Sequence, residues 1–113
     1  MMTPKQIIEH RARLYTEKNG GGVYDLYSEN SDLKRFFTDI ESFCVRFSEI
    51  TGESSHAGLN IVKELVKGKL AEVTFIEYFS KEDKILSFFS RSRLILEEGR
   101  WRILREEREM SIK

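Results

Sequence analysis

The N-terminal part of the chain carries its hydrophobic residues three and four positions apart, which is the spacing of an amphipathic helix. A first helix should start after Thr3, which can cap it, with Pro4 in the first turn and Gln6 able to complete a capping box. It should end near residues 18–19. The three glycines at 20–22 that follow are expected to act as a flexible joint.

A longer periodic segment follows this joint. Residues 23–27 favour a short helical piece, and Asn30 or Ser31 can cap the next helix. The spacing then predicts one continuous helix that ends by Ile50. Its apolar face should be buried and contains the following residues: Leu33, Phe36, Phe37, Ile40, Phe43, Cys44 and Phe47.

The second half of the chain changes to alternation of apolar and polar residues, which is typical of strands. Residues 70–79, 84–96 and 101–108 fit this pattern, and residues 51–55 should form a loop. Residues 59–66 fit either a helix or a strand. We favour a strand, because the next two residues can then form a tight hairpin.

The order of these elements predicts an α+β fold, in which N-terminal helices pack on one face of a four-stranded antiparallel sheet. The chain has 113 residues, of which 40% are hydrophobic. A single domain spanning residues 1–113 is therefore expected.

The last hairpin predicts which side chains lie opposite one another. With Glu98-Gly99 as its loop, Leu96 should lie opposite Trp101, and Ser92 should lie opposite Arg105.

The preceding turn, centred on Lys81-Glu82, should place Phe79 opposite Lys84. The two hairpins together predict a mostly apolar face toward the helices: Val73, Phe75, Glu77, Phe79, Leu86, Phe88, Ser90, Ser92, Leu94, Leu96, Trp101, Ile103 and Arg105.

The opposite face mixes large apolar groups with arginine, and a face left to water should be more polar. A partner should therefore cover it, and a two-fold homodimer is the expected arrangement. The candidate interface residues are Ile76, Tyr78, Phe89, Arg91, Arg93 and Leu104.

Charge and composition exclude some classes of protein. Nineteen basic and nineteen acidic side chains cancel, which argues against a nucleic-acid binder. No apolar run is long enough to span a membrane, and the N-terminus has no secretory signal, so a cytoplasmic protein is expected. The excess of charged residues over Asn and Gln also resembles the composition of heat-adapted proteins.

Metal and cofactor sites are not expected. Cys44 is the single cysteine, and His10 and His56 lie too far apart for the usual spacing of metal ligands. Neither histidine has a serine or cysteine at a spacing that would suggest a catalytic triad.

One residue is a weak candidate for a catalytic role. Glu77 interrupts an apolar strand face between Phe75 and Phe79. In a pocket its pKa could be raised, and it could act as a general acid or base. The alternative is a structural ion pair with Lys or Arg.

Other polar residues on the same face could form the floor of a pocket, or could only satisfy one another. Three tyrosines could line its mouth, or could be ordinary core residues. The candidate pocket-lining residues are Tyr15, Tyr24, Tyr27, Glu77, Ser90, Ser92 and Arg105.

Three segments carry a resemblance to a known family: Ala71-Glu72-Val73-Thr74-Phe75, residues 89–94, and Glu97-Glu98-Gly99-Arg100-Trp101. They resemble the middle domain of bacterial SEC-C-motif proteins, which has the nuclear transport factor 2-like, cystatin-like fold. The resemblance implies a curved sheet that wraps a long helix and leaves a pocket. The zinc-binding ends of that family are absent here, and Leu94 replaces a family aromatic.

Two functions are compatible with these features. The first is a non-catalytic, homodimeric binding or assembly module whose ligand would be small and apolar or acidic. The alternative is a small isomerase or hydrolase that uses Glu77 as acid or base beside a tyrosine hydroxyl. An arginine partner for Glu77 would weaken the enzyme hypothesis.

Overall fold

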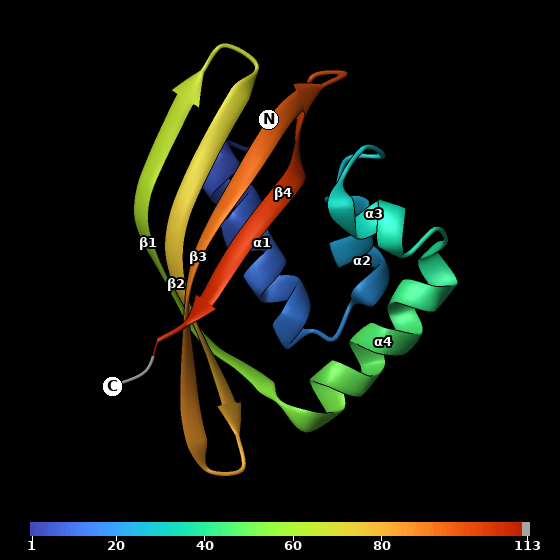
Figure 1. The fold of residues 1–113 in the computed structure, drawn as a ribbon, viewed down its shortest axis with the longest axis vertical. Coiled ribbons are helices and arrows are strands. Elements are labelled where there is room, and N and C mark those ends of the chain that lie inside the picture. Colours follow the sequence, from blue (N-terminus) through green and yellow to red (C-terminus); the bar gives the residue numbers. More distant parts are fainter. Residues whose placement is uncertain (112–113) are drawn as a thin grey trace.

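The structure is a computed structural model that describes residues 1–111, and it consists of helices followed by a sheet (Figure 1). The elements are α1 (Pro4–Thr16), α2 (Gly20–Asp25), α3 (Asp32–Phe36), α4 (Ile40–Glu53), β1 (Ser55–Lys67), β2 (Leu70–Lys81), β3 (Lys84–Glu97) and β4 (Arg100–Met110). The four strands form an antiparallel meander in the order β1-β2-β3-β4. The predicted α+β class is therefore confirmed.

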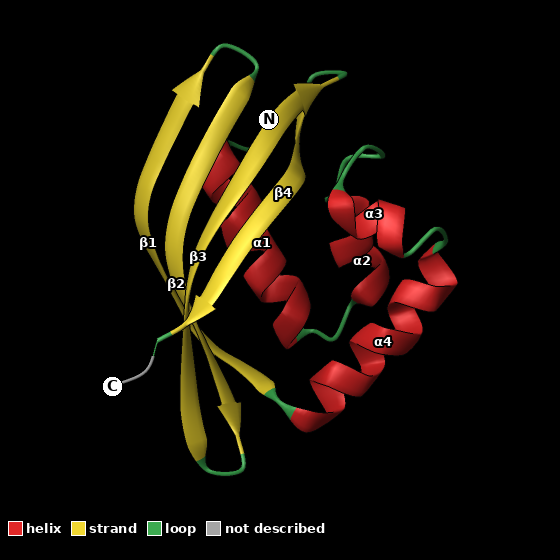
Figure 2. Ribbon diagram, viewed as in Figure 1, coloured by secondary structure: helices red, strands yellow, loops and turns green. Residues whose placement is uncertain are grey.

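The curved sheet has helices on one side only (Figure 2). Helix α1 packs against β1, β2 and β4, and α2 packs against both α1 and α4. Helix α4 lies farther from the sheet than α1 does, with the other helices beside it (Figure 1).

Helix α1 begins with the predicted capping box, in which the Thr3 hydroxyl accepts a hydrogen bond from the backbone N–H of Gln6 at 3.2 Å. Its apolar stripe includes Ile8, which is fully buried, and Leu14. Arg11 lies on the same stripe and is only 1% exposed. A buried arginine on a core helix requires partners, because an unpaired charge is costly to bury.

The predicted continuous helix over residues 31–50 is wrong. The chain leaves the helical conformation at Phe37, and Asp39 caps a new helix by accepting a hydrogen bond from the backbone N–H of Ser42 at 2.7 Å. A short polar side chain at this position favours a new helix start over continuation. Consequently Phe36 is 80% exposed and Ile40 is 46% exposed, contrary to the predicted burial.

The glycines at 20–22 are part of α2 and do not form the expected joint. At Gly20 an added Cβ would come within 3.0 Å of the Phe47 ring. Glycine therefore permits α2 to approach α4 closely at this point.

Residues 59–66 form part of a strand, as favoured from the sequence. The expected loop at 51–55 is wrong, because α4 continues to Glu53 and β1 starts at Ser55. Two register shifts in β1 mark bulges, between His56 and Gly58 and between Ile61 and Lys63.

In the last hairpin, Leu96 lies opposite Trp101 as predicted. A register shift between Arg93 and Leu94 then changes the pairing, so that Ser92 lies opposite Glu106 and not opposite Arg105. A bulge inserts one residue, which reverses the face of every later side chain on that strand.

The preceding turn is centred on Glu82 and Asp83, which both have positive φ. Phe79 therefore lies opposite Leu86, and the predicted pairing with Lys84 is wrong. This error amounts to two residues and leaves the face assignment unchanged, because side chains alternate with period two. The inward face forms the core with Val73, Phe75, Leu94 and Ile103, which are all fully buried.

Candidate functional site

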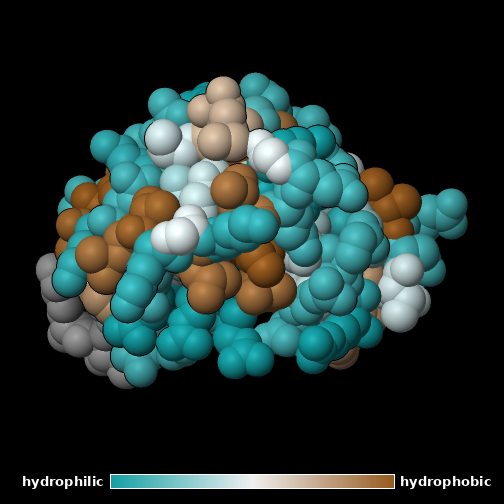
Figure 3. All heavy atoms as spheres, turned by 90° about the horizontal axis from the view of Figure 1, so that it is seen from above, coloured by the Kyte–Doolittle hydropathy of each residue, from teal (hydrophilic) through white to brown (hydrophobic). Residues whose placement is uncertain are grey.

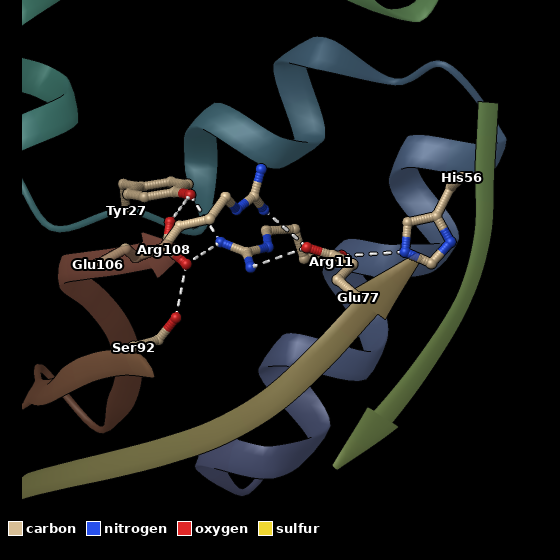
Figure 4. Close-up of polar contacts among 7 residues, drawn as sticks. All are labelled: Arg11, Tyr27, His56, Glu77, Ser92, Glu106 and Arg108. Carbon is tan, nitrogen blue, oxygen red and sulfur yellow. Dashed lines mark hydrogen bonds and ion pairs between the residues drawn. The ribbon is translucent and has the colours of Figure 1, made fainter. Parts of the chain in front are cut away.

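Glu77 on β2 is fully buried. Its carboxylate lies toward Arg11, Arg108 and His56 (Figure 4). Its Oε1 accepts a hydrogen bond from Nη2 of Arg108 at 2.8 Å, and its Oε2 lies 3.0 Å from Nε2 of His56. The Nη2 atom of Arg11 lies 3.9 Å from Oε1. The carboxylate is thus surrounded by cationic and hydrogen-bonding groups from α1, β1 and β4.

Burial by itself would raise the pKa of Glu77, but the hydrogen bond from His56 and the charges of Arg11 and Arg108 lower it below its usual value. Glu77 is therefore ionised near neutral pH and is a weak base. The contacts of Glu77 with Arg11 and Arg108 weaken the hypothesis that it is a catalytic acid or base.

A second carboxylate, Glu106 on β4, is also in contact with Arg11. Glu106 accepts hydrogen bonds at 2.5 Å from Nη1 of Arg11, from the Tyr27 hydroxyl and from the Ser92 hydroxyl. Nη1 of Arg11 also donates to the Tyr27 oxygen at 2.8 Å. These contacts join α1, β3, β4 and the segment after α2.

Burial would raise the pKa of Glu106, but the Arg11 charge and the hydrogen bonds from Arg11, Ser92 and Tyr27 lower it to about 2. Burial raises the pKa of Tyr27 well above its usual value, although Arg11 opposes this. Both groups therefore keep a single protonation state near neutral pH.

Arg11 connects the two carboxylates, as its position between Glu77 and Glu106 in Figure 4 shows. Burial would lower the pKa of Arg11, but Glu106, Tyr27 and Glu77 raise it well above its usual value. Its Nε and Nη2 atoms are buried and have no hydrogen-bond partner among the described residues.

A cleft of about 300 Å³ lies between the helices and the sheet, beside the polar contacts of Arg11, Tyr27 and Glu106. Its lining includes Tyr15, Tyr27 and Ser90, three of the predicted pocket residues. The Ser90 side chain is 2% exposed, and its hydroxyl has no hydrogen-bond partner among the described residues. The helix side of the cleft is formed mainly by the following apolar residues: Leu33, Phe37, Phe43, Phe47 and Ile50.

The other predicted pocket residues lie elsewhere. Glu77 and Ser92 belong to the buried polar contacts and do not line the cleft. The Tyr24 hydroxyl donates to the backbone oxygen of Phe37 at 2.9 Å. Arg105 is on the outward face because of the bulge, and its Nε lies 3.3 Å from Asp32.

Four residues of the site are missing from the sequence prediction: Arg11, His56, Glu106 and Arg108. Arg11 had a detectable signal, because it lies on the apolar stripe of the first helix with Ile8 and Ala12. Glu106 and Arg108 had none, since their inward direction depends on the bulge in the last hairpin.

The outward face of the sheet mixes apolar and charged side chains. Phe89 is 41% exposed, and Ile76 and Tyr78 are half-buried. Arg91 and Arg93 lie 3.7 Å and 3.6 Å from the carboxylate of Glu72.

A hollow of about 440 Å³ is bordered by Leu65, Leu70 and Leu104, near the turn between β1 and β2. In the view from above (Figure 3), hydrophobic side chains lie on the surface among hydrophilic ones.

Within residues 1–111, no group of three or more His, Cys, Asp or Glu side chains is arranged to hold a metal ion. None of the helices in the described part of the chain is both long and apolar enough to cross a membrane.

The chain matches no protein-family model and no curated relative. Its fold matches a SEC-C motif containing protein from Rhodopseudomonas palustris with a TM-score of 0.73 at 21% identity, covering 97% of this chain and 80% of that one. An NTF2-like protein with a cystatin-like fold from Novosphingobium aromaticivorans gives 0.68 at 10% identity, covering 93% and 77%.

A candidate Ca/calmodulin-dependent kinase II association domain from Exiguobacterium sibiricum gives a TM-score of 0.69 at 15% identity, covering 100% of this chain and 99% of that one. These similarities confirm the resemblance drawn from residues 71–101 at the level of the fold. The chain therefore has the cystatin-like fold of nuclear transport factor 2-like proteins, which SEC-C motif proteins share.

Proposed function

We propose that this protein is a non-catalytic module that binds a small molecule in the cleft between α4 and the sheet. The observation that carries the proposal is the Ser90 hydroxyl, which is buried at the cleft and unpartnered among the described residues. Buried hydroxyl groups are almost always hydrogen-bonded, so a ligand atom that pairs with Ser90 would remove a cost to folding.

The charge arrangement below the cleft supports binding in preference to acid–base catalysis. The low pKa of Glu77 and of Glu106 keeps both carboxylates ionised, and each is in contact with arginine. A general acid or base works best with a pKa near the operating pH. The same contacts would hold the cleft in one shape before a ligand arrives, which favours binding.

We also propose that the module is a homodimer formed through the outward sheet face. That face presents both Glu72 and two arginines, Arg91 and Arg93, beside exposed apolar groups such as Phe89. A surface with both charge signs can be complementary to itself across a two-fold axis. The structural neighbour described as a candidate association domain supports an assembly role for this fold.

The test of binding compares two leucine substitutions on the same strand. Ser90→Leu fills the floor of the cleft, and Ser87→Leu adds the same side chain on the opposite face, where Ser87 lies across from Tyr78. A fragment library is screened by thermal shift against the wild type and both variants, with circular dichroism to establish that each folds.

Compounds that raise the melting temperature of the wild type and of Ser87→Leu should not raise that of Ser90→Leu, because ligands stabilise the state that they bind. Equal shifts in both variants would place binding outside the cleft. An absence of stabilising compounds, together with no wild-type NMR shift changes around Ser90, would contradict the proposal. The NMR measurement applies even if Ser90→Leu does not fold.

A further inference from the structure

The two sides of the cleft differ in chemistry, which bears on the class of ligand. The helix side is mostly apolar, with aromatic rings among its residues, and the sheet side includes the polar residues Ser90 and Arg108. Ligand sites commonly combine an apolar lining with a few placed polar groups that fix orientation. The inference below rests on the proposed function and specifies the ligand of that same cleft.

Ser90 and Arg108 are direct cross-strand partners on β3 and β4. Side chains in such a pair share one face, with Cβ atoms about 5 Å apart. Both residues line the cleft, which places them side by side next to a ligand bound there. A carboxylate fits this pair, since it accepts hydrogen bonds through both oxygens and makes strong bonds to arginine.

Arg108 has donors to spare. A guanidinium carries five N–H donors, and within residues 1–111 only Nη2 of Arg108 makes a hydrogen bond, to Glu77. Its guanidinium also lies over the rings of Phe79 and Phe88, 5.6 Å and 5.1 Å from their centroids. These contacts involve the ring faces and the positive charge, and the N–H groups of Arg108 other than that to Glu77 have no hydrogen-bond partner among the described residues.

The charged residues around the cleft are of both signs. Three arginines line it, Arg11, Arg46 and Arg108, and Glu106 lines it beside Arg11. Glu77 lies outside the lining and contacts Arg11 and Arg108. Arg46 makes no ion pair among the described residues. A third carboxylate, Glu107, borders the cleft but lies opposite Arg91 in the register, on the outward face.

The preference for an anion therefore comes from the unused N–H donors of Arg108 and not from a net charge. A carboxylate would accept hydrogen bonds from these donors, and a cationic ligand would meet repulsion from the same guanidinium.

We propose that the ligand is a small monocarboxylate with an apolar ring, bound with its carboxylate between Ser90 and Arg108. The ring lies against Phe43 and Phe47, whose own rings are 5.7 Å apart and form part of the helix side. The cleft volume of about 300 Å³ suits one ring with a short chain, because it is at the lower end for small-molecule sites.

The experiment uses three probes of equal length: 4-phenylbutyrate, 4-phenylbutan-1-ol and 4-phenylbutylamine. Their dissociation constants are measured by isothermal titration calorimetry at neutral pH with the full chain. The acid should bind about tenfold or more tightly than the alcohol, because it gains charge-assisted hydrogen bonds. The amine should bind more weakly than the alcohol.

Two substitutions test the carboxylate position, and one is a control. Ser90→Ala removes a hydroxyl without removing a charge, and Arg108→Met keeps an apolar stem. Both should reduce the preference for the acid several-fold and leave the affinity for the alcohol nearly unchanged. Arg91→Met, on the opposite face, should change neither. If Arg108→Met does not fold, Ser90→Ala alone decides the point.

The outcomes separate this inference from the proposed function. Equal affinities for the acid and the alcohol, with NMR shift changes around Ser90, would overturn the carboxylate inference and leave the cleft as a binding site. A preference for the acid that Ser90→Ala and Arg108→Met do not reduce would also overturn it. If neither these probes nor the fragment library bind at the cleft, the proposed function itself fails.

Discussion

At the scale of single residues, the central feature is Arg11, because one buried guanidinium approaches both Glu77 and Glu106. Replacing a whole buried ion pair with hydrophobic residues often leaves the stability of a protein unchanged or higher. Removing only one partner lowers stability, because it leaves an uncompensated buried charge. The contribution of Arg11 can be measured as a change in the free energy of unfolding.

Arg11→Met should lower the free energy of unfolding by about 3–5 kcal/mol, because two carboxylates lose a buried partner. The matched control is Arg13→Met on the exposed side of the same helix, which should change it by less than about 0.5 kcal/mol. Urea unfolding followed by circular dichroism measures both. Equal effects would mean that the Arg11 contacts do not form.

Stability should also depend on pH through Glu106. Its pKa is about 2 in the folded chain and near 4.5 in the unfolded chain. The unfolded state therefore takes up the proton first as the pH falls. The stabilisation is present above about pH 4.5 and is lost progressively toward pH 2, by an amount on the order of 3 kcal/mol.

Glu106→Gln should flatten this loss between about pH 5 and pH 2, since the variant has no carboxylate at this position. Glu107→Gln changes the adjacent exposed carboxylate and should keep the wild-type profile. Free energies of unfolding measured across this range compare the three proteins. A Glu106→Gln profile as steep as that of the wild type would contradict the low pKa.

At the scale of elements, the break between α3 and α4 decides which aromatic residues reach the core. Asp39 starts α4 at a new angle, so that Phe43 and Phe47 face inward, whereas Phe36 and Ile40 remain exposed. Helical spacing alone could not separate these pairs, because all four fit one apolar stripe.

Phe43→Ala should cost about 3–5 kcal/mol of stability, because it removes a buried ring and leaves a cavity. Ile40→Ala should cost less than about 1 kcal/mol, since much of its surface already contacts water. Thermal or chemical unfolding of the two variants gives the comparison. Similar losses of stability in the two variants would contradict the break between α3 and α4 and support the single long helix predicted from the sequence.

At the scale of the whole molecule, the helices cover one face of the sheet and leave the other face uncovered (Figure 2). Phe89→Asp should convert the proposed dimer into monomers, because it places a charge within an apolar contact. Val45→Asp on α4 is the control, since this residue is 65% exposed on the helical side and should leave the dimer intact.

Sedimentation velocity at micromolar concentrations measures the assembly of the wild type and both variants. A wild-type monomer at high micromolar concentration would contradict the homodimer. It would leave the cleft proposal unaffected, because Ser90 and Phe89 lie on opposite faces of β3.

The sequence by itself determined the features that depend on near neighbours. The capping box at Thr3, the meander of strands and the inward direction of Phe75 and Ser90 follow from local spacing and alternation. The face assignment survived an error of two residues in the turn before Lys84, because two is the period of a strand.

Only the tertiary structure decided the polar contacts beneath the cleft. The bulge at Leu104 on β4 exchanges Arg105 for Glu106 on the inward face, and nothing in the local pattern marks it. Arg11 and Glu106 are 95 positions apart, so their contact forms only when α1 packs across the sheet. Local preferences are set by adjacent side chains, whereas the partners of a buried charge are set by which distant elements enclose it.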